Sequence, residues 1–405
     1  MSILDELIAE FCPDGVIYKT LGEIGKFYGG LSGKSKDDFA EGNAKYATYS
    51  NIYSNLSLDI DIRDRVKIKN DEKQTIIEYG DILFTGSSET PDECGMSSVL
   101  TKKIDEKIYL NSFCFGFRLY DKNLLLPGFS KYLFRTEDIR TQIKRTANGV
   151  TRYNISKKRM GKVVIPLPPL PVQQEIVRIL DNFTELTAEL TAELTAELTA
   201  RRKQYEYYRD LLLSFGDDVE YRKIKDIYKR LKGTPITARK MKEINNVNGE
   251  IKVFAGGKTV INASEQDIPK ANITRVPAVL IQSRGVIDAV YYDKPFTFKN
   301  EMWAYTSDSV IAVKYLYYVL KNGISHFREA ASGMGSLPQI SLRVTEEFII
   351  PVPPLEEQER IVAILDRFDA LCNDLTIGIP AEIEARQKQY EYYRDKLLSF
   401  KEVSA

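Results

Sequence analysis

An eight-residue segment that occurs twice is the feature of this 405-residue chain that most constrains its fold. KQYEYYRD stands at Lys203–Asp210 and again at Lys388–Asp395. The same offset aligns the proline-rich segment Pro166–Leu170 with Pro351–Leu355, and no gap is needed between the two matches. An internal repeat of this kind indicates that one structural unit occurs twice. We therefore expect a tandem repeat.

A weaker match marks the start of each half. Tyr18–Ile24 resembles Tyr221–Ile227, so each half consists of a variable block followed by a repeated helical block. The repeat is also circular, because the C-terminus stops where a third variable block would begin, and residues 1–17 are expected to pack beside it. The expected domains are residues 1–165 and 217–350, and the expected helical regions are residues 166–216 and 351–405.

The helical blocks have the pattern of long amphipathic helices. From Gln173 to about Phe215 there is no Pro or Gly, and the TAEL repeats place leucines on one helix face. Such a helix is roughly 60 Å long, at about 1.5 Å per residue. The second copy carries Gly378 and Pro380, so we expect a kink or break there. A narrow apolar stripe needs a partner helix, which the other copy can supply. An ordinary coiled coil, in which the length of the helix does not set any distance, explains the pattern equally well.

The variable blocks predict compact α+β domains. Residues 18–160 hold short β-branched and aromatic runs punctuated by Gly and Asn, followed by a helix-like segment. Residues 221–345 show the same order, although the two blocks share little sequence. The expected fold class is therefore α+β, with two such domains separated by two long antiparallel helices in a pseudo-twofold tandem repeat.

The neutral overall charge conceals two basic segments. The chain holds 57 Lys and Arg against 57 Asp and Glu, but residues 139–162 hold eight basic residues and no acid. Residues 222–242 hold nine basic residues and one acid. Basic segments in corresponding regions of a repeat favour binding to DNA phosphates. A solvated helix face is the alternative for each segment taken alone.

Candidate DNA contacts lie in the basic segments and in loops that follow corresponding strands. Tyr153 can stack on a base, and the loops Thr85–Ser88 and Gln282–Gly285 are candidates for groove contacts. The full candidate set is Thr85, Gly86, Ser87, Ser88, Lys144, Arg145, Arg152, Tyr153, Lys157, Lys258, Ser283 and Arg284.

No motif predicts catalysis or a metal site. Gly30–Ser35 resembles a phosphate loop, but Tyr28 stands where the spacing requires Gly. The single histidine, His326, and four cysteines without a C-x-x-C pair argue against zinc. The chain has no apolar stretch long enough for a membrane span, and its acidic N-terminal segment lacks the basic region of a secretory signal. We therefore expect a cytoplasmic protein without catalytic or metal-binding residues.

Together these features resemble one family, the DNA specificity subunits of type I restriction-modification systems. The resemblance covers essentially the whole chain and is carried by Pro168–Asp181, Pro353–Asp366, both KQYEYYRD segments and the TAEL repeats. It implies two target recognition domains, each reading one half of a split site in double-stranded DNA, held apart by antiparallel spacer helices. It also implies that the chain is not itself an enzyme.

The resemblance further implies assembly with two modification (methyltransferase) subunits and two ATP-dependent restriction subunits. No cofactor is expected in this chain, since S-adenosylmethionine, ATP and Mg would bind to those partners. Tyr and Arg are typical interface anchors, so the KQYEYYRD side chains are candidate contacts to the modification subunits. These candidates are Tyr205, Tyr208, Arg209, Tyr390, Tyr393 and Arg394. Helix–helix packing is the alternative role for them.

Two functions of other classes remain open at this point. The first is a stand-alone nuclease or methyltransferase with tandem DNA-binding domains. The second is a coiled-coil scaffold that does not bind DNA.

Overall fold

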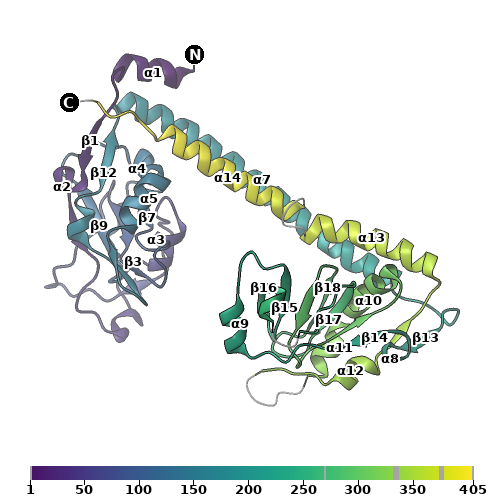
Figure 1. Ribbon diagram of the computed structural model, residues 1–405. Coiled ribbons are helices and arrows are strands. Elements are labelled where there is room, and N and C mark those ends of the chain that lie inside the picture. Colours follow the sequence, from purple (N-terminus) through teal and green to yellow (C-terminus); the bar gives the residue numbers. More distant parts are fainter. Residues whose placement is uncertain (1, 269–270, 332–336, 374–377, 404–405) are drawn as a thin grey trace. The chain divides into compact units, whose positions relative to one another are not determined.

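The computed structural model describes all residues except 1, 269–270, 332–336, 374–377 and 404–405. The chain divides into two compact units, one formed by residues 1–192 with 384–405 and the other by residues 193–383. Each unit contains one variable domain together with the helix segments that pack on it (Figure 1).

Unit 1 contains a four-stranded antiparallel sheet in the order β2-β9-β5-β7. Its strands are β2 (Gly25–Gly29), β5 (Ile82–Thr85), β7 (Ser97–Val99) and β9 (Cys114–Leu119). A smaller sheet has the order β4-β3-β8, with β3 and β8 parallel. It consists of β3 (Ala44–Ala47), β4 (Arg65–Val66) and β8 (Ile108–Leu110).

Two cores form because β5 is apolar on both faces. Ile82 and Phe84 point to one side and pack with Phe129, which lies on helix α4 (Pro127–Leu133). Leu83 points to the other side and packs with Leu110 of the smaller sheet. Alternating side chains of a strand lie on opposite faces, so this sheet is covered on both sides. Helix α5 (Glu137–Lys144) also contributes to the first core.

Unit 2 has the same strand order and strand directions. The larger sheet is β14-β20-β17-β18, and the smaller is β16-β15-β19 with β15 and β19 parallel. The strands are β14 (Lys229–Leu231), β15 (Ile251–Phe254), β16 (Val260–Ala263), β17 (Ala278–Gln282), β18 (Asp288–Tyr292), β19 (Phe296–Phe298) and β20 (Trp303–Thr306). Helix α10 (Val310–Asn322) takes the place of α4. The variable blocks are therefore two copies of one topology.

In each unit a two-stranded ladder joins the domain to the helices. β1 (Ile17–Thr20) pairs with β12 (Val164–Leu167), and β13 (Tyr221–Lys223) pairs with β21 (Ile349–Pro351). Three helices follow: α7 (Leu170–Leu212) after β12, and α13 (Leu355–Asn373) and α14 (Ile379–Leu397) after β21. The second helical region is interrupted next to Gly378, as predicted from Gly378 and Pro380. Pro380 lies in the first turn of α14, where proline fits a helix.

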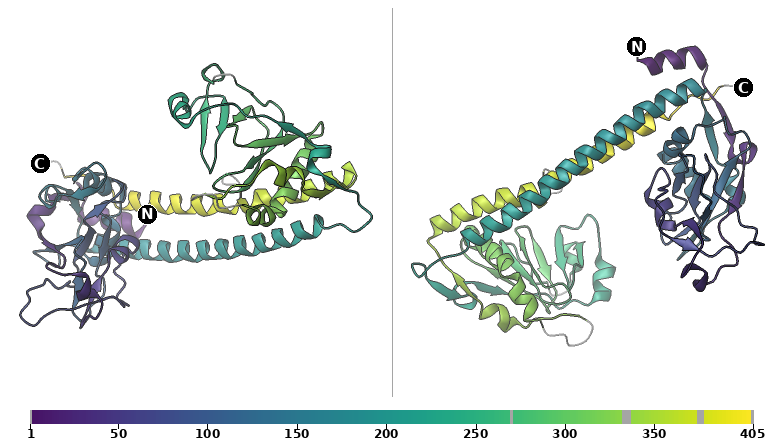
Figure 2. Two further views of the ribbon diagram at one scale, coloured as in Figure 1. Left: turned by 90° about the horizontal axis from the view of Figure 1, so that it is seen from below. Right: turned by 180° about the vertical axis from the view of Figure 1, so that it is seen from behind.

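The helices pair in antiparallel fashion within each unit (Figure 2). In unit 1, α14 lies along the first half of α7, and the Phe183 and Tyr393 rings are 5.8 Å apart. In unit 2, α13 lies along the second half of α7, and the Phe368 and Tyr208 rings are 5.7 Å apart. These two contacts join equivalent positions of the repeat, with the roles of the two helices exchanged.

The circular character of the repeat is confirmed by one hydrogen bond that occurs twice. The Tyr221 hydroxyl donates to the Phe215 carbonyl at 2.9 Å, where α7 leads into the second domain. In unit 1 the Tyr18 hydroxyl donates to the Phe400 carbonyl at 2.9 Å, and Val16 pairs with Glu402. The N-terminal residues therefore pack beside the C-terminal segment, as expected. Helix α1 (Ile3–Phe11) completes this end of unit 1 and buries Leu4.

One aspartate on α7 and one on α13 each bind the adjoining domain. In unit 1 Asp181 accepts hydrogen bonds from Lys131 and Tyr132, both at 2.7 Å. In unit 2 Asp366 accepts a hydrogen bond from Lys314 at 2.6 Å and another from the Tyr318 hydroxyl. Burial and the neighbouring aspartate raise the pKa of Tyr132 and Tyr318 well above the usual range, so both hydroxyls remain donors.

Candidate nucleic-acid interface

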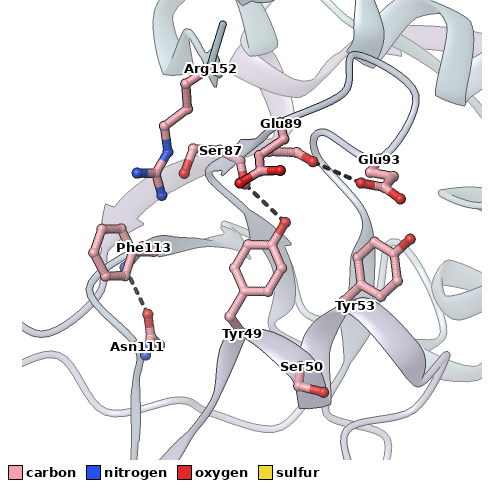
Figure 3. A pocket seen from close by; sticks show the side chains of 10 residues that line it. Tyr49, Ser50, Tyr53, Ser87, Glu89, Glu93, Asn111, Phe113 and Arg152 are labelled. Atoms are coloured by element: carbon pink, nitrogen blue, oxygen red, sulfur yellow. Dashed lines mark hydrogen bonds between the residues drawn. The ribbon is translucent and has the colours of Figure 1, made fainter. Parts of the chain in front are cut away.

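Loops from strands far apart in the sequence meet at one edge of the unit 1 domain. They follow β3, β5 and β8, and they join the hairpin of β10 (Ala147–Asn148) and β11 (Tyr153–Ile155). A pocket of about 540 Å³ opens at this edge (Figure 3). Its lining residues are Tyr49, Ser50, Tyr53, Ser87, Ser88, Glu89, Glu93, Asn111, Phe113 and Arg152.

The structure brings the two candidate segments of unit 1 together at this pocket. Ser87 and Ser88 form the short strand β6, which pairs with β11 so that Ser88 lies opposite Tyr153. The Gly86 N–H donates to the Phe113 carbonyl at 2.8 Å, and a side chain at Gly86 would lie 2.6 Å from that oxygen. Only glycine fits there, because any side chain would clash with the Phe113 carbonyl oxygen.

Aromatic side chains form the floor and one wall of the pocket. Helix α3 (Tyr49–Ser54) carries Tyr49 and Tyr53, whose rings stack at 6.2 Å, and the Tyr49 hydroxyl donates to the Ser87 carbonyl at 2.9 Å. Phe113 is 58% exposed, and the Arg152 guanidinium lies 5.6 Å from its ring centroid. Aromatic rings and a guanidinium can contact base edges or stack on bases. Sequence patterns missed Tyr49, Tyr53 and Phe113 because helix α3 and the loop that carries Phe113 are far apart in the sequence.

Two carboxylates also line the pocket, and they have different surroundings. Glu93 accepts a hydrogen bond from the Ser88 hydroxyl at 3.1 Å. Burial raises the pKa of Tyr53, and the Glu93 carboxylate beside that ring raises it further. Glu89 is exposed at the pocket, and among the described residues no hydrogen bond or ion pair of its carboxylate is recorded.

The basic segment of unit 1 divides into a structural part and an exposed part. Arg140 is buried and donates to the carbonyls of residues 92, 94 and 95, so it holds a loop and is no surface charge. Lys144 is half-buried and lies 3.0 Å from the Asp92 carboxylate. Arg145, Arg152 and Lys157 are exposed. Among the candidate DNA contacts in this segment, these three side chains are the exposed ones that can reach phosphates or bases.

All four candidate Ser and Thr residues are buried inside the domains. Thr85 is fully buried, and its hydroxyl oxygen accepts the Met96 N–H at 2.9 Å. Ser283 is also buried and donates to the Glu301 carbonyl at 2.6 Å. Both residues shape the loops that follow β5 and β17. Ser87 and Ser88 are also buried, whereas Arg284 is exposed.

The corresponding edge of unit 2 gathers the other candidates. Lys258 and Arg284 are both exposed, and the Gly257 N–H donates to the Arg284 carbonyl at 2.9 Å. The same backbone bond extends the parallel pairing of the smaller sheet in each domain: the N–H that follows β8 or β19 donates at 3.0 Å to the last residue of β3 or β15. Equivalent loops therefore form the same edge in both domains.

The second basic segment is mostly neutralised by carboxylates. Lys223 and Lys225 share the Glu347 carboxylate, and their hydrogen bonds lower its pKa to about 2. Arg230 pairs with Glu346 at 3.2 Å. The alternative interpretation, a solvated surface, fits these residues better than a phosphate-binding run.

The KQYEYYRD side chains divide between packing and exposure. Tyr205 and Tyr208 lie three positions apart on one helix face and both contact Phe368, and Tyr390 and Tyr393 occupy the equivalent positions in unit 1. Arg209 bonds to Asp210 and to Asn322, and Arg394 bonds to Asp395. The remaining tyrosine of each copy points away from this face: Tyr207 is 65% exposed and Tyr392 is 61% exposed. Helical spacing alone predicts that Tyr207 and Tyr392 lie off the packed face, so the sequence could have identified these two as the exposed tyrosines.

Neither a cluster of metal-ligating side chains nor a membrane-spanning helix is found among the described residues. They contain no group of three or more His, Cys, Asp or Glu side chains placed to hold a metal ion. None of the helices seen in the described ranges has the length and apolar character needed to cross a membrane.

Comparison with known proteins identifies the family. The family model "Type I restriction modification DNA specificity domain" matches residues 13–200 and again residues 216–385. The chain belongs to this family. The two matches coincide with the two copies of the repeat. The predicted class, a DNA specificity subunit and not a stand-alone nuclease or methyltransferase, is thereby confirmed.

Named relatives agree with this membership. The chain is 40% identical over 271 residues to the "Type I restriction enzyme EcoR124I/EcoR124II specificity subunit" of Escherichia coli, a match that covers 62% of this chain and 66% of the relative, just under two thirds. It is 31% identical over 310 residues to the "Type I restriction enzyme MpnII specificity subunit" of Mycoplasma pneumoniae, covering 61% of this chain and 92% of the relative. Both relatives are named as specificity subunits, as expected for a chain that is not itself an enzyme.

A solved structure shares the fold. A chain from a study of complex assembly and conformational transition of the type I R-M system superposes with a TM-score of 0.65 at 17% sequence identity. The match covers 96% of this chain and 98% of that chain. The predicted α+β fold with two tandem domains and a long helix is confirmed.

Proposed function

We propose that this chain reads a split site in double-stranded DNA, with each domain recognising one half. The observation that carries the proposal is the edge that both domains build from equivalent loops. In unit 1 that edge presents Phe113 and Arg152, and in unit 2 it presents Lys258 and Arg284. The side chains differ while the topology is the same, as expected for two domains that read different sequences. The proposal places the protein in the cytoplasm because chromosomal DNA is the substrate.

The repeat also supports a partner stoichiometry. Each copy of KQYEYYRD leaves one tyrosine exposed, Tyr207 in one and Tyr392 in the other, so the chain presents two equivalent helical surfaces. Equivalent surfaces favour two copies of one partner. We propose two modification subunits bound there, and two restriction subunits that join the complex. S-adenosylmethionine, ATP and Mg would bind to those partners, which would methylate adenine and cleave DNA.

Exchange of one domain tests the proposal directly. Residues 18–160 are replaced by the corresponding block of a relative, and the complex with its modification subunits is expressed in a host without other adenine methylation. Sequencing of methylated DNA should show a split motif in which one half is changed and the other is retained. A change in both halves, or no motif from the unmodified chain, would contradict it.

A further inference from the structure

Carboxylates at the edge of the unit 1 domain need an explanation of their own. DNA carries a dense row of negative phosphates, so an exposed carboxylate on a DNA-binding edge weakens binding through charge repulsion. A carboxylate is favourable there only when it accepts a hydrogen bond from an amino group of a base. Glu89 and Glu93 both line the pocket.

The two carboxylates differ in what they already bind. Glu93 accepts the Ser88 hydroxyl and lies beside Tyr53, so it belongs to the wall of the pocket. Glu89 is exposed, and its carboxylate has no recorded partner among the residues that the structure describes. In Figure 3 Glu89 lies between the side formed by Phe113 and Arg152 and the side formed by Tyr53 and Glu93. Glu89 is therefore the carboxylate whose acceptor atoms are free.

Arg152 is held in place while its donors stay free. It is exposed, its guanidinium lies over the Phe113 ring, and no ion pair is recorded for it in the described ranges. The hairpin that carries it turns at Gly149, whose φ of +137° suits glycine, and a side chain there would lie 1.9 Å from the Arg152 carbonyl. The position of the guanidinium over the ring restricts the Arg152 side chain before DNA binds, which lowers the entropic cost of a specific contact.

We infer that Glu89 and Arg152 read one C·G base pair in the major groove. In that groove cytosine offers the N4 amino donor, and guanine offers the O6 and N7 acceptors on the same edge. A carboxylate accepts from N4, and a planar guanidinium donates to O6 and N7 together. An A·T pair has no two adjacent acceptors for the guanidinium on one base, so it loses the bidentate contact. This inference rests on the proposed function and adds the base pair that the first domain selects.

The test uses the complete complex of this chain with its modification subunits. The half-site altered by exchange of residues 18–160 should contain a C·G pair. Glu89→Ala and Arg152→Ala should each relax that same position, with discrimination falling about 5- to 140-fold, which corresponds to about 1–3 kcal/mol. Arg152→Lys keeps the charge and should relax the position as well. The matched controls, Glu185→Ala and Arg178→Ala, are exposed on α7 and lie outside the pocket, so they should leave the sequence of the motif unchanged.

The outcomes separate this inference from the proposed function. Recognition of the other half-site shows that each variant is folded and assembled. If the unmodified complex gives no split motif, the proposed function fails. If the motif is present but its first half lacks a C·G pair, the inference is wrong and the function stands. The inference is also overturned when Glu89→Ala and Arg152→Ala relax different positions, or when both leave the motif unchanged.

Discussion

Removing one TAEL repeat should shorten the unread spacer of the DNA site by one base pair. The change is deletion of Thr191–Leu194 within α7, which runs without a break from Leu170 to Leu212. The chain passes from unit 1 to unit 2 within α7 and returns to unit 1 within α14. Four helical residues contribute about 6 Å of rise and about 400° of rotation, which is about 40° beyond a full turn. One base pair contributes about 3.4 Å and roughly 34–36°.

Rotation is the quantity that decides this result. A mismatch of about 5° per repeat is small, so each domain keeps nearly the same groove after the deletion. The rise differs by about 2–3 Å, which a tilt of the helix or a slight distortion of the duplex can absorb. The second helical region is interrupted next to Gly378, so a shortened α7 does not face one rigid partner helix along its whole length.

The assay is sequencing of methylated DNA from cells that express the full complex. The deletion variant should give both half-sites unchanged and a spacer shorter by one base pair. A variant with one additional TAEL repeat should give a spacer longer by one base pair, and the length-preserving Thr191→Ala should leave the spacer unchanged. A methylated motif with an unchanged spacer in the deletion variant would refute the measuring role and leave an ordinary coiled coil.

Three further predictions concern the helices and the basic edge. Ile176→Ala removes a fully buried side chain and should lower the free energy of unfolding by about 2–5 kcal/mol, whereas Leu186→Ala, 63% exposed, should change it by less than about 0.5 kcal/mol in chemical denaturation. Lys157→Ala should flatten the salt dependence of DNA binding by about one unit in a shift assay at several salt concentrations, and an unchanged slope would show that Lys157 contacts no phosphate. Replacing Tyr207 and Tyr392 together by Ser should reduce co-purification of the modification subunits while the thermal unfolding of this chain is retained, and full co-purification would place the docking surface elsewhere.

The helical regions could be predicted because their signals are local. The Pro-rich lead-in, the spacing of leucines and the pair Gly378 and Pro380 each act within a few residues, so the helix starts and the interruption follow from the chain itself. Helical spacing also explains why Tyr205 packs and Tyr207 does not. The sequence did not reveal that the two variable blocks share one topology. Strand order depends on which faces of the strands are buried, and many different residues can form the same buried face.

The candidate site was only partly predictable for a related physical reason. Counting charges found the exposed Arg152 but also counted Arg140, because composition does not show that a guanidinium is buried against backbone carbonyls. The pocket joins Tyr49 of helix α3 with Glu89 and Phe113 of two separate loops, and nothing local marks them as neighbours. Only the parallel pairing of β3 with β8 and the pairing of β6 with β11 bring these loops to one edge.

The repeat separates the contacts that hold a domain from those that read DNA. In each domain a lysine and a tyrosine donate hydrogen bonds to one aspartate of the helix that follows the domain. This aspartate is Asp181 of α7 in unit 1 and Asp366 of α13 in unit 2. The aspartates lie on the repeated helices α7 and α13, and their lysine and tyrosine partners lie on α4 and α10, which have the same position in the two domains. In the described part of the chain, no hydrogen bond joins the loops at the reading edge to α7 or α13, so their side chains can differ, as Arg152 and Arg284 do in their surroundings. A change at the edge should therefore alter which bases are read without moving the domain on its helix, whereas loss of Asp181 should disturb placement of the first domain whatever sequence it reads.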